Sequence, residues 1–227
     1  HDWSVYCAVN RRFAEMIARR YRPGDIVLVH DYQLTLVPQM VRELVPTATV
    51  GFFLHVPFPA SDVFRILPWR REIIDGIMGA DLVGFHTKAY GTAFVDTAST
   101  LLSLDATTTA EGGSAASGDA PLAPVDGLVR VLRRNGRTVR VAAHPIGIDF
   151  DDFTSVAKSS EVEVELASLE REARGKRIVL GVDRLDYTKG IPRRLMAFER
   201  FLERYPKWRD RVLFIQAHDL GAPSTSR

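Results

Sequence analysis

Short apolar runs alternate with helical patterns along most of the chain, and this alternation constrains the fold more than any other feature. Runs rich in β-branched and aromatic residues predict strands, and they lie at 26–29, 49–54, 81–85, 178–182 and 212–216. Parallel strands need a crossover of about a dozen residues or more, usually a helix, and the spacing between these runs provides it. The expected class is therefore α/β, with doubly wound parallel sheets.

Ligands of doubly wound folds bind beyond the carboxyl ends of the strands, so the residues that end each predicted strand are informative. They are polar or conformationally permissive throughout: Asp31, His55, His86, Gly147, Arg184 and Gln216. One polar strand end means little, since strands must end somewhere, but a complete set predicts a binding crevice. The alternative for Asp31 is a turn aspartate that caps the next helix.

Residues 177–192 form the most informative of these strand ends. A buried strand, a charged turn and a helix with proline in its first turn follow one another directly. Arg184 and Lys189 then lie beside a helix N-terminus, where the helix dipole and free N–H groups already favour an anion. The turn therefore predicts a phosphate-bearing ligand. The alternative is an ordinary charged loop, in which Arg184 pairs with Asp183 or Asp186 and Lys189 is solvated.

Composition bears on three questions: nucleic-acid binding, the redox compartment and membrane association. The 227 residues include 30 Lys and Arg against 28 Asp and Glu, spread along the chain, so the net charge of +2 gives no argument for a nucleic-acid partner. Cys7 is the only cysteine, which fits a reducing compartment. The chain shows neither a secretory leader pattern nor an apolar run near the ~20 residues that span a bilayer. These features predict a cytoplasmic protein without a membrane partner.

Several common sites are excluded by spacing. The Rossmann glycine fingerprint and the Walker A sequence are both absent, and no cysteine pair could hold zinc. His30, His55 and His86 lack the short helical spacing of a metalloprotease. Each of these histidines, taken alone, is more often structural than catalytic.

Residues 105–124 are dominated by Ala, Thr, Gly and Ser. Such a segment cannot bury enough apolar surface to offset its conformational entropy, so we expect a disordered insertion. Asn135-Gly136, between alternating runs at 128–132 and 138–142, predicts a β-hairpin.

Five motifs together resemble the trehalose-6-phosphate synthase family. In that family's order, they are HDYQL at 30–34, GFFLHVPFP at 51–59, DLVGFHT at 81–87, PIGID at 145–149 and VDRLDYTKG at 182–190. The resemblance implies the GT-B architecture, in which two Rossmann-like domains face each other across a cleft, both incomplete in this chain. Residues 1–148 would be the C-terminal part of the N-terminal, acceptor-side domain, and 149–227 the start of the UDP-glucose-side domain.

The resemblance also implies a retaining, metal-independent glycosyltransferase without a cofactor, acting in trehalose biosynthesis. It would transfer glucose from UDP-glucose to glucose 6-phosphate, giving α,α-trehalose 6-phosphate and UDP. By motif, Asp31 would bind the acceptor, His55 would contact the donor glucose, and Arg184 with Lys189 would hold the diphosphate; these four form the implied catalytic set. Arg227 would bind the acceptor phosphate. Fixed cations suit this role because the leaving UDP gains negative charge in the transition state.

Segments that the family has on either side of residues 1–227 are not in this chain, so the resemblance implies an internal fragment that is inactive by itself. Two alternatives stay open. One is a related transferase with another phosphorylated acceptor, such as glucosylglycerol-phosphate synthase, and the other is a non-catalytic regulatory module. Homo-oligomerisation and fusion to a trehalose-phosphatase domain also stay open for the full-length protein.

Overall fold

The computed structural model describes residues 2–104, 106–107, 127–134 and 136–219. The chain divides into two compact units, His1–Gly147 and Ile148–Arg227, which are described separately. Among the described helices there is no candidate for a membrane span.

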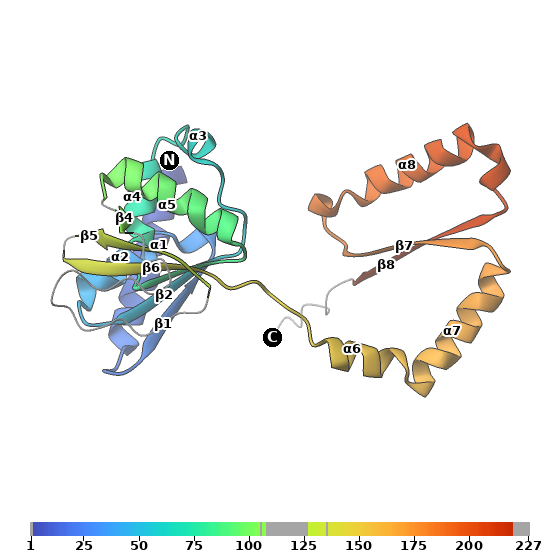
Figure 1. The fold of residues 1–227 in the computed structure, drawn as a ribbon, viewed down its shortest axis with the longest axis horizontal. Coiled ribbons are helices and arrows are strands. Elements are labelled where there is room, and N and C mark those ends of the chain that lie inside the picture. Colours follow the sequence, from blue (N-terminus) through green and yellow to red (C-terminus); the bar gives the residue numbers. More distant parts are fainter. Residues whose placement is uncertain (1, 105, 108–126, 135, 220–227) are drawn as a thin grey trace. The chain divides into compact units, whose positions relative to one another are not determined.

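Unit 1 is built on a six-stranded sheet of order β1-β2-β3-β6-β5-β4 (Figure 1). The four parallel neighbours are β1 (Ile26–His30), β2 (Thr49–Leu54), β3 (Leu82–Phe85) and β6 (Arg137–Ala143). On the other side of β6, β5 (Leu128–Arg134) and β4 (Ala106–Thr107) continue the sheet in antiparallel pairing. The hairpin predicted around Gly136 is confirmed by the β5–β6 pair.

The short strand β4 corrects one expectation. We expected no regular structure between residues 105 and 124, but Ala106 and Thr107 pair with Leu132 and Val131 of β5. The free edge of the hairpin offers unpaired backbone groups, and even a polar segment gains hydrogen bonds by pairing with them. The rest of the predicted insertion lies outside the described residues.

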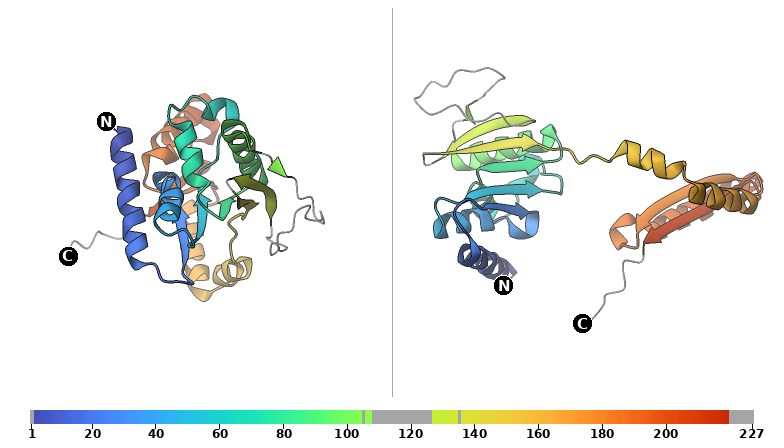
Figure 2. Two further views of the ribbon diagram at one scale, coloured as in Figure 1. Left: turned by 90° about the vertical axis from the view of Figure 1, so that its left-hand side faces the viewer. Right: turned by 90° about the horizontal axis from the view of Figure 1, so that it is seen from below.

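Helices cover one face of the unit 1 sheet. They are α1 (Asp2–Arg20), α2 (Val37–Leu44), α3 (Ser61–Phe64), α4 (Arg70–Ile77) and α5 (Lys88–Leu102), with the 3-10 turn η1 (Tyr32–Leu34) after β1. Alternate residues of β2 are buried beneath them, among them Val50 and Phe52 at 1% exposure each. Ile26 and Leu28, on the opposite face of β1, are 75% and 60% exposed. In the right-hand view of Figure 2 the strands accordingly lie in front of the helices.

A cluster of phenylalanines anchors the loop that follows β2 in the core. Phe58 is 5% exposed, and its ring centroid lies 4.9 Å from that of Phe64 and 5.4 Å from that of Phe94. Its neighbours Pro57 and Pro59 restrict the backbone on either side. The loop directly after His55 is therefore held in place by core packing.

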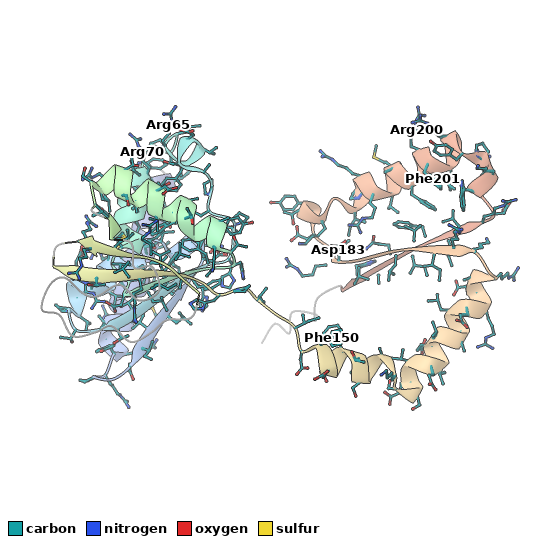
Figure 3. All side chains as sticks on the ribbon, in the orientation of Figure 1. Arg65, Arg70, Phe150, Asp183, Arg200 and Phe201 are labelled. Atoms are coloured by element: carbon teal, nitrogen blue, oxygen red, sulfur yellow. The ribbon has the colours of Figure 1, made fainter. Side chains whose placement is uncertain are left out.

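Unit 2 contains a parallel pair of strands, β7 (Arg177–Arg184) and β8 (Val212–Asp219). Two helices precede β7, α6 (Phe150–Ala157) and α7 (Ser160–Ala173), and the connection to β8 holds η2 (Tyr187–Lys189), α8 (Ile191–Arg204) and η3 (Pro206–Trp208). The rings of Phe198 and Phe214 join α8 to β8, with centroids 4.9 Å apart. Figure 3 shows Phe201 directed from α8 toward the strands and Asp183 on the side of β7 that faces α8.

Two elements of unit 2 differ from expectation. β7 extends two residues beyond the predicted run and ends at Arg184, because parallel pairing continues as far as Asp219 of β8. Helix α6 is absent from the predicted elements, although its first turn carries a recognisable signal. The side chain of Asp149 caps this helix by accepting a hydrogen bond from the Asp152 N–H at 3.0 Å.

Candidate active site

Asp31 joins the carboxyl ends of β1 and β2. Its N–H donates to the Phe53 carbonyl at 2.8 Å, and its Oδ1 accepts from the His55 N–H at 3.1 Å. Its backbone has φ 68°, in the region that favours glycine, and its side chain makes no capping bond to η1. The alternative of a helix-capping aspartate is therefore wrong, because the carboxylate serves the neighbouring strand. Strained backbone of this kind concentrates at functional sites.

Helix α1 holds the turn after Asp31. Asn10 is fully buried; its Nδ2 donates to the Gln33 carbonyl at 3.0 Å, and its Oδ1 accepts from the Leu36 N–H at 3.1 Å. The Tyr6 hydroxyl donates to the Tyr32 carbonyl at 2.7 Å. Sequence reasoning missed both residues. The available signal was an asparagine beside an apolar helical stripe, since buried polar groups need partners.

The imidazole of His55 lies in an aromatic cluster at the same sheet edge. Its Nε2 lies 2.9 Å from Nδ1 of His30, and the ring centroids of Phe53 and His55 are 4.8 Å apart. Phe53 also meets His86 edge-on, at 5.0 Å between centroids. Gly84 makes this arrangement possible, because a Cβ there would lie 2.6 Å from Cδ2 of Phe53.

Two further histidines lie at the ends of the adjacent strands. His86 follows β3, and His144 follows β6 where Gly147 was the expected strand-end residue. Nδ1 of His86 and Nε2 of His144 are buried atoms without a hydrogen-bond partner among the described residues. Buried polar atoms usually have partners, so an ordered water is the expected partner of each nitrogen.

In unit 2, Arg184 and Lys189 flank one turn. The Arg184 side chain is 74% exposed, and its Nη2 lies 4.0 Å from Oδ2 of Asp186, at the outer limit of an ion pair. Asp183 pairs instead with Arg194 at 2.7 Å. Exposed ion pairs contribute little to stability, so pairing with Asp186 is a weak alternative to ligand binding for Arg184. The guanidinium remains available to an anion.

The turn itself is fixed locally. Oδ1 of Asp186 accepts from both the N–H and the hydroxyl of Thr188, each at 2.8 Å. These two bonds, helped by the charges of Arg184 and Lys189, hold the pKa of Asp186 below its ordinary value of 3.8. Lys189 ends η2, and Gly190, with φ 63°, is the N-cap residue of α8. The ammonium group is therefore carried next to the free N–H groups of a helix N-terminus.

The structure thus brings Asp31 and His55 together in unit 1, and Arg184 and Lys189 together in unit 2. Arg227 lies outside the described residues. Gln216 does not end its strand: it lies within β8, where its Oε1 accepts from Arg194 at 2.8 Å. In the part of the chain that the structure describes, no group of three or more His, Cys, Asp or Glu is placed to hold a metal ion.

Comparison with known families places these residues in context. The model of glycosyltransferase family 20 matches residues 1–225. The chain belongs to this family. Among curated relatives of this family 20 chain, the UDP-forming alpha,alpha-trehalose-phosphate synthase of Schizosaccharomyces pombe is 41% identical over 219 residues, which cover 95% of this chain and 39% of that protein. A bifunctional trehalose-6-phosphate synthase/phosphatase of Thermoproteus tenax is 42% identical over 216 residues, covering 94% and 26%.

Solved structures agree with the family assignment. A UDP-forming alpha,alpha-trehalose-phosphate synthase of Burkholderia xenovorans, in complex with glucose-6-phosphate, has a TM-score of 0.77 at 33% identity and covers 96% of this chain and 45% of that one. The N-terminal domain of a Candida albicans trehalose-6-phosphate phosphatase has a TM-score of 0.73 at 36% identity, covering 94% and 42%. The predicted α/β fold of GT-B type is confirmed. The family 20 chain spans less than half the length of these relatives.

Proposed function

We propose that the full-length protein is a UDP-forming trehalose-6-phosphate synthase. It transfers glucose from UDP-glucose to glucose 6-phosphate with retention, giving α,α-trehalose 6-phosphate and UDP. The observation that carries the proposal is the arrangement of Asp31, His55, Arg184 and Lys189, which all lie at or just beyond the carboxyl ends of parallel strands. The curated synthases that match across the chain support the same reading.

Within unit 1, Asp31 binds the acceptor. One carboxylate oxygen accepts the His55 N–H, which leaves Oδ2 and the remaining lone pairs to accept from a sugar hydroxyl. Attack on the face that UDP leaves needs no enzymic nucleophile, so Asp31 orients the acceptor rather than attacking the donor. His55 contacts the donor glucose. A related synthase solved with glucose-6-phosphate supports this acceptor.

Within unit 2, Arg184 and Lys189 bind the donor diphosphate. Negative charge grows on the leaving UDP as the glycosidic bond breaks, so two fixed cations stabilise the transition state more than the ground state. The acceptor hydroxyl attacks the anomeric carbon on the face that UDP leaves, and its proton passes to the leaving phosphate, so the configuration is retained. This mechanism assigns no step to a metal ion, and we expect full activity in the presence of EDTA.

The test uses the full-length protein, UDP-glucose and a panel of phosphorylated acceptors. We expect UDP release to be stimulated most by glucose 6-phosphate, with an α,α-linked product by NMR. Asp31→Asn should lower acceptor-dependent turnover, whereas Asp62→Asn, at a side chain that is 92% exposed on α3, should not. Preference for a different acceptor, such as glycerol 3-phosphate, would favour the related transferase instead.

A second candidate is a non-catalytic, regulatory synthase-like module. The observation in its favour is the similar N-terminal domain of a trehalose-6-phosphate phosphatase. Calorimetry separates the two candidates: a regulatory module would bind glucose 6-phosphate or UDP-glucose without releasing UDP from the mixture. Because one relative is a bifunctional synthase/phosphatase, we also propose that the full-length protein carries a fused phosphatase domain, which an assay of phosphate release would check. Homo-oligomerisation and a cytoplasmic location stay predictions.

A further inference from the structure

We propose that His30 is a positioning residue, which holds the imidazole of His55 in one orientation and one tautomer for glucosyl transfer. This inference rests on the proposed function, in which His55 contacts the donor glucose. No motif role was assigned to His30, which is the last residue of β1.

The contact between the two rings carries the inference. Nδ1 of His30 and Nε2 of His55 lie 2.9 Å apart, so one nitrogen carries the proton and the other accepts it. Nε2 of His55 is thereby occupied, and Nδ1 is the ring nitrogen left for a ligand. Whether a neutral His55 presents Nδ1 as donor or acceptor then depends on which ring holds the shared proton.

The backbone at Asp31 explains how two consecutive residues can both reach His55. Successive side chains of a strand point to opposite faces, so His30 and Asp31 would ordinarily diverge. The positive φ of Asp31, 68°, ends that alternation. As a result two consecutive residues act on His55: Asp31 accepts from its backbone N–H, and His30 bonds to its ring. Both the backbone and the side chain of His55 are fixed from β1.

Packing restricts the same ring from the other sides. The Phe53 ring lies 4.8 Å from that of His55 and tilts by 53° against it. His86 approaches His55 edge-on, with centroids 5.6 Å apart, and its Nδ1 has no hydrogen-bond partner among the described residues. His86 therefore offers a matched control, because it touches His55 by packing whereas His30 also bonds to it.

The kinetic test compares His30→Phe, His30→Asn and His86→Phe in the full-length protein. Phe keeps a ring against Phe53 but removes the nitrogen, and Asn returns a polar atom near the position of Nδ1. We expect His30→Phe to lower kcat/KM for UDP-glucose about tenfold, because a misplaced His55 ring binds the transition state less tightly. KM for the acceptor and Tm should stay unchanged. His30→Asn should restore most of the loss, and His86→Phe should cost less than His30→Phe.

A double-variant cycle tests whether His30 acts through His55. In a His55→Phe background, His30→Phe should cause no further loss of kcat/KM. Independent, multiplying losses would overturn the positioning role, as would wild-type kcat/KM in His30→Phe. Equal losses in His30→Phe and His86→Phe would also overturn it, since packing alone would then explain both.

Imidazole ¹⁵N NMR of the full-length protein gives a readout that does not need turnover. We expect His55 in one tautomer in the wild type and in exchange between two in His30→Phe. Mixed tautomers in the wild type would overturn the inference even if His30→Phe does not fold. An unchanged His55 spectrum in folded His30→Phe would overturn it as well. If no acceptor supports transfer, the proposed function fails, and the NMR result still decides whether His30 positions His55.

Discussion

The two units carry candidate residues at similar places, the ends of parallel strands, but they hold them differently. In unit 1 the strand ends rest on a closed core: Phe52 and Leu54 of β2 are 1% and 5% exposed. In unit 2 the apolar residues of β7 are open, with Leu180 and Val182 at 63% and 69% exposure. The described part of unit 2 buries few apolar side chains, namely Ala173, Ile191 and Val212.

This difference extends to the candidate residues. Asp31 is tied by its backbone to Phe53 and by its carboxylate to His55, so its position is set before any ligand arrives. Arg184 is 74% exposed, and an exposed guanidinium loses rotamer freedom when a ligand binds. We infer that unit 1 supplies pre-organised contacts, whereas unit 2 supplies charge on a locally stiffened turn.

Truncating an apolar side chain should give the largest difference in unfolding free energy between the two units. Phe58→Ala in unit 1 should cost about 3–5 kcal/mol of unfolding free energy, because a fully packed aromatic side chain leaves a cavity. The matched change in unit 2, Leu180→Ala, should stay within about 0.5 kcal/mol in residues 1–227, since that side chain is 63% exposed. Denaturant unfolding followed by a probe in each unit measures both. Similar costs at the two sites would show that β7 is covered as well as β2.

Removing the cations of unit 2 should affect turnover but not stability. In the full-length protein, Arg184→Ala and Lys189→Ala should each cost roughly 2–4 kcal/mol of transition-state stabilisation, while Tm stays near the wild-type value. Arg200→Ala is the matched control, because that arginine is 81% exposed on α8 and directed away from the strands (Figure 3). Near-normal kcat/KM in both turn variants would remove the diphosphate assignment.

Local patterns were enough to predict much of this fold. The alternation of apolar runs and helical stripes located the strands and helices of unit 1, and the Asn-Gly pair located its hairpin, because each signal is contained within a few neighbouring residues. Polar strand ends singled out Asp31 and His55 for the same reason. The structure adds that a hydrogen bond links them.

Features that depend on distant partners escaped prediction. The buried bonds of Asn10 join residues 23 and 26 positions apart, and β4 forms because a hairpin edge is available to pair with. The extension of β7 to Arg184 likewise follows from its partner β8. Gly84 did carry a signal, since glycine within a strand often marks the close approach of another group.

A substitution at Gly84 should disturb the pre-organised strand ends of unit 1. A Cβ at this position would lie 2.6 Å from the Phe53 ring, so Gly84→Ala should displace that ring and the His55 imidazole beside it. We expect a loss of about 1–3 kcal/mol of stability from overpacking, together with a fall in kcat/KM. Gly147→Ala is the control, because nothing lies within 4 Å of the added Cβ and its φ is not in the positive region. Equal Tm values for the two variants would contradict the tight approach at Gly84.

The smallest expected effect concerns Asp186, which stiffens the turn of unit 2. The Thr188 N–H is the main cause of its lowered pKa, followed by the Thr188 hydroxyl and then by the charges of Arg184 and Lys189. Because the folded pKa lies below the ordinary value of 3.8, the stabilisation is complete above that value and is lost as the pH falls through the folded pKa.

Thr188→Val removes the hydroxyl bond but keeps the N–H, so it should raise the pKa of Asp186 only part of the way, and Thr188→Ser should leave it low. Carboxyl ¹³C NMR titration measures all three proteins. A pKa that stays equally low in Thr188→Val would mean that the backbone bond and the two cations alone hold the turn, and that the hydroxyl contributes nothing to its stiffness.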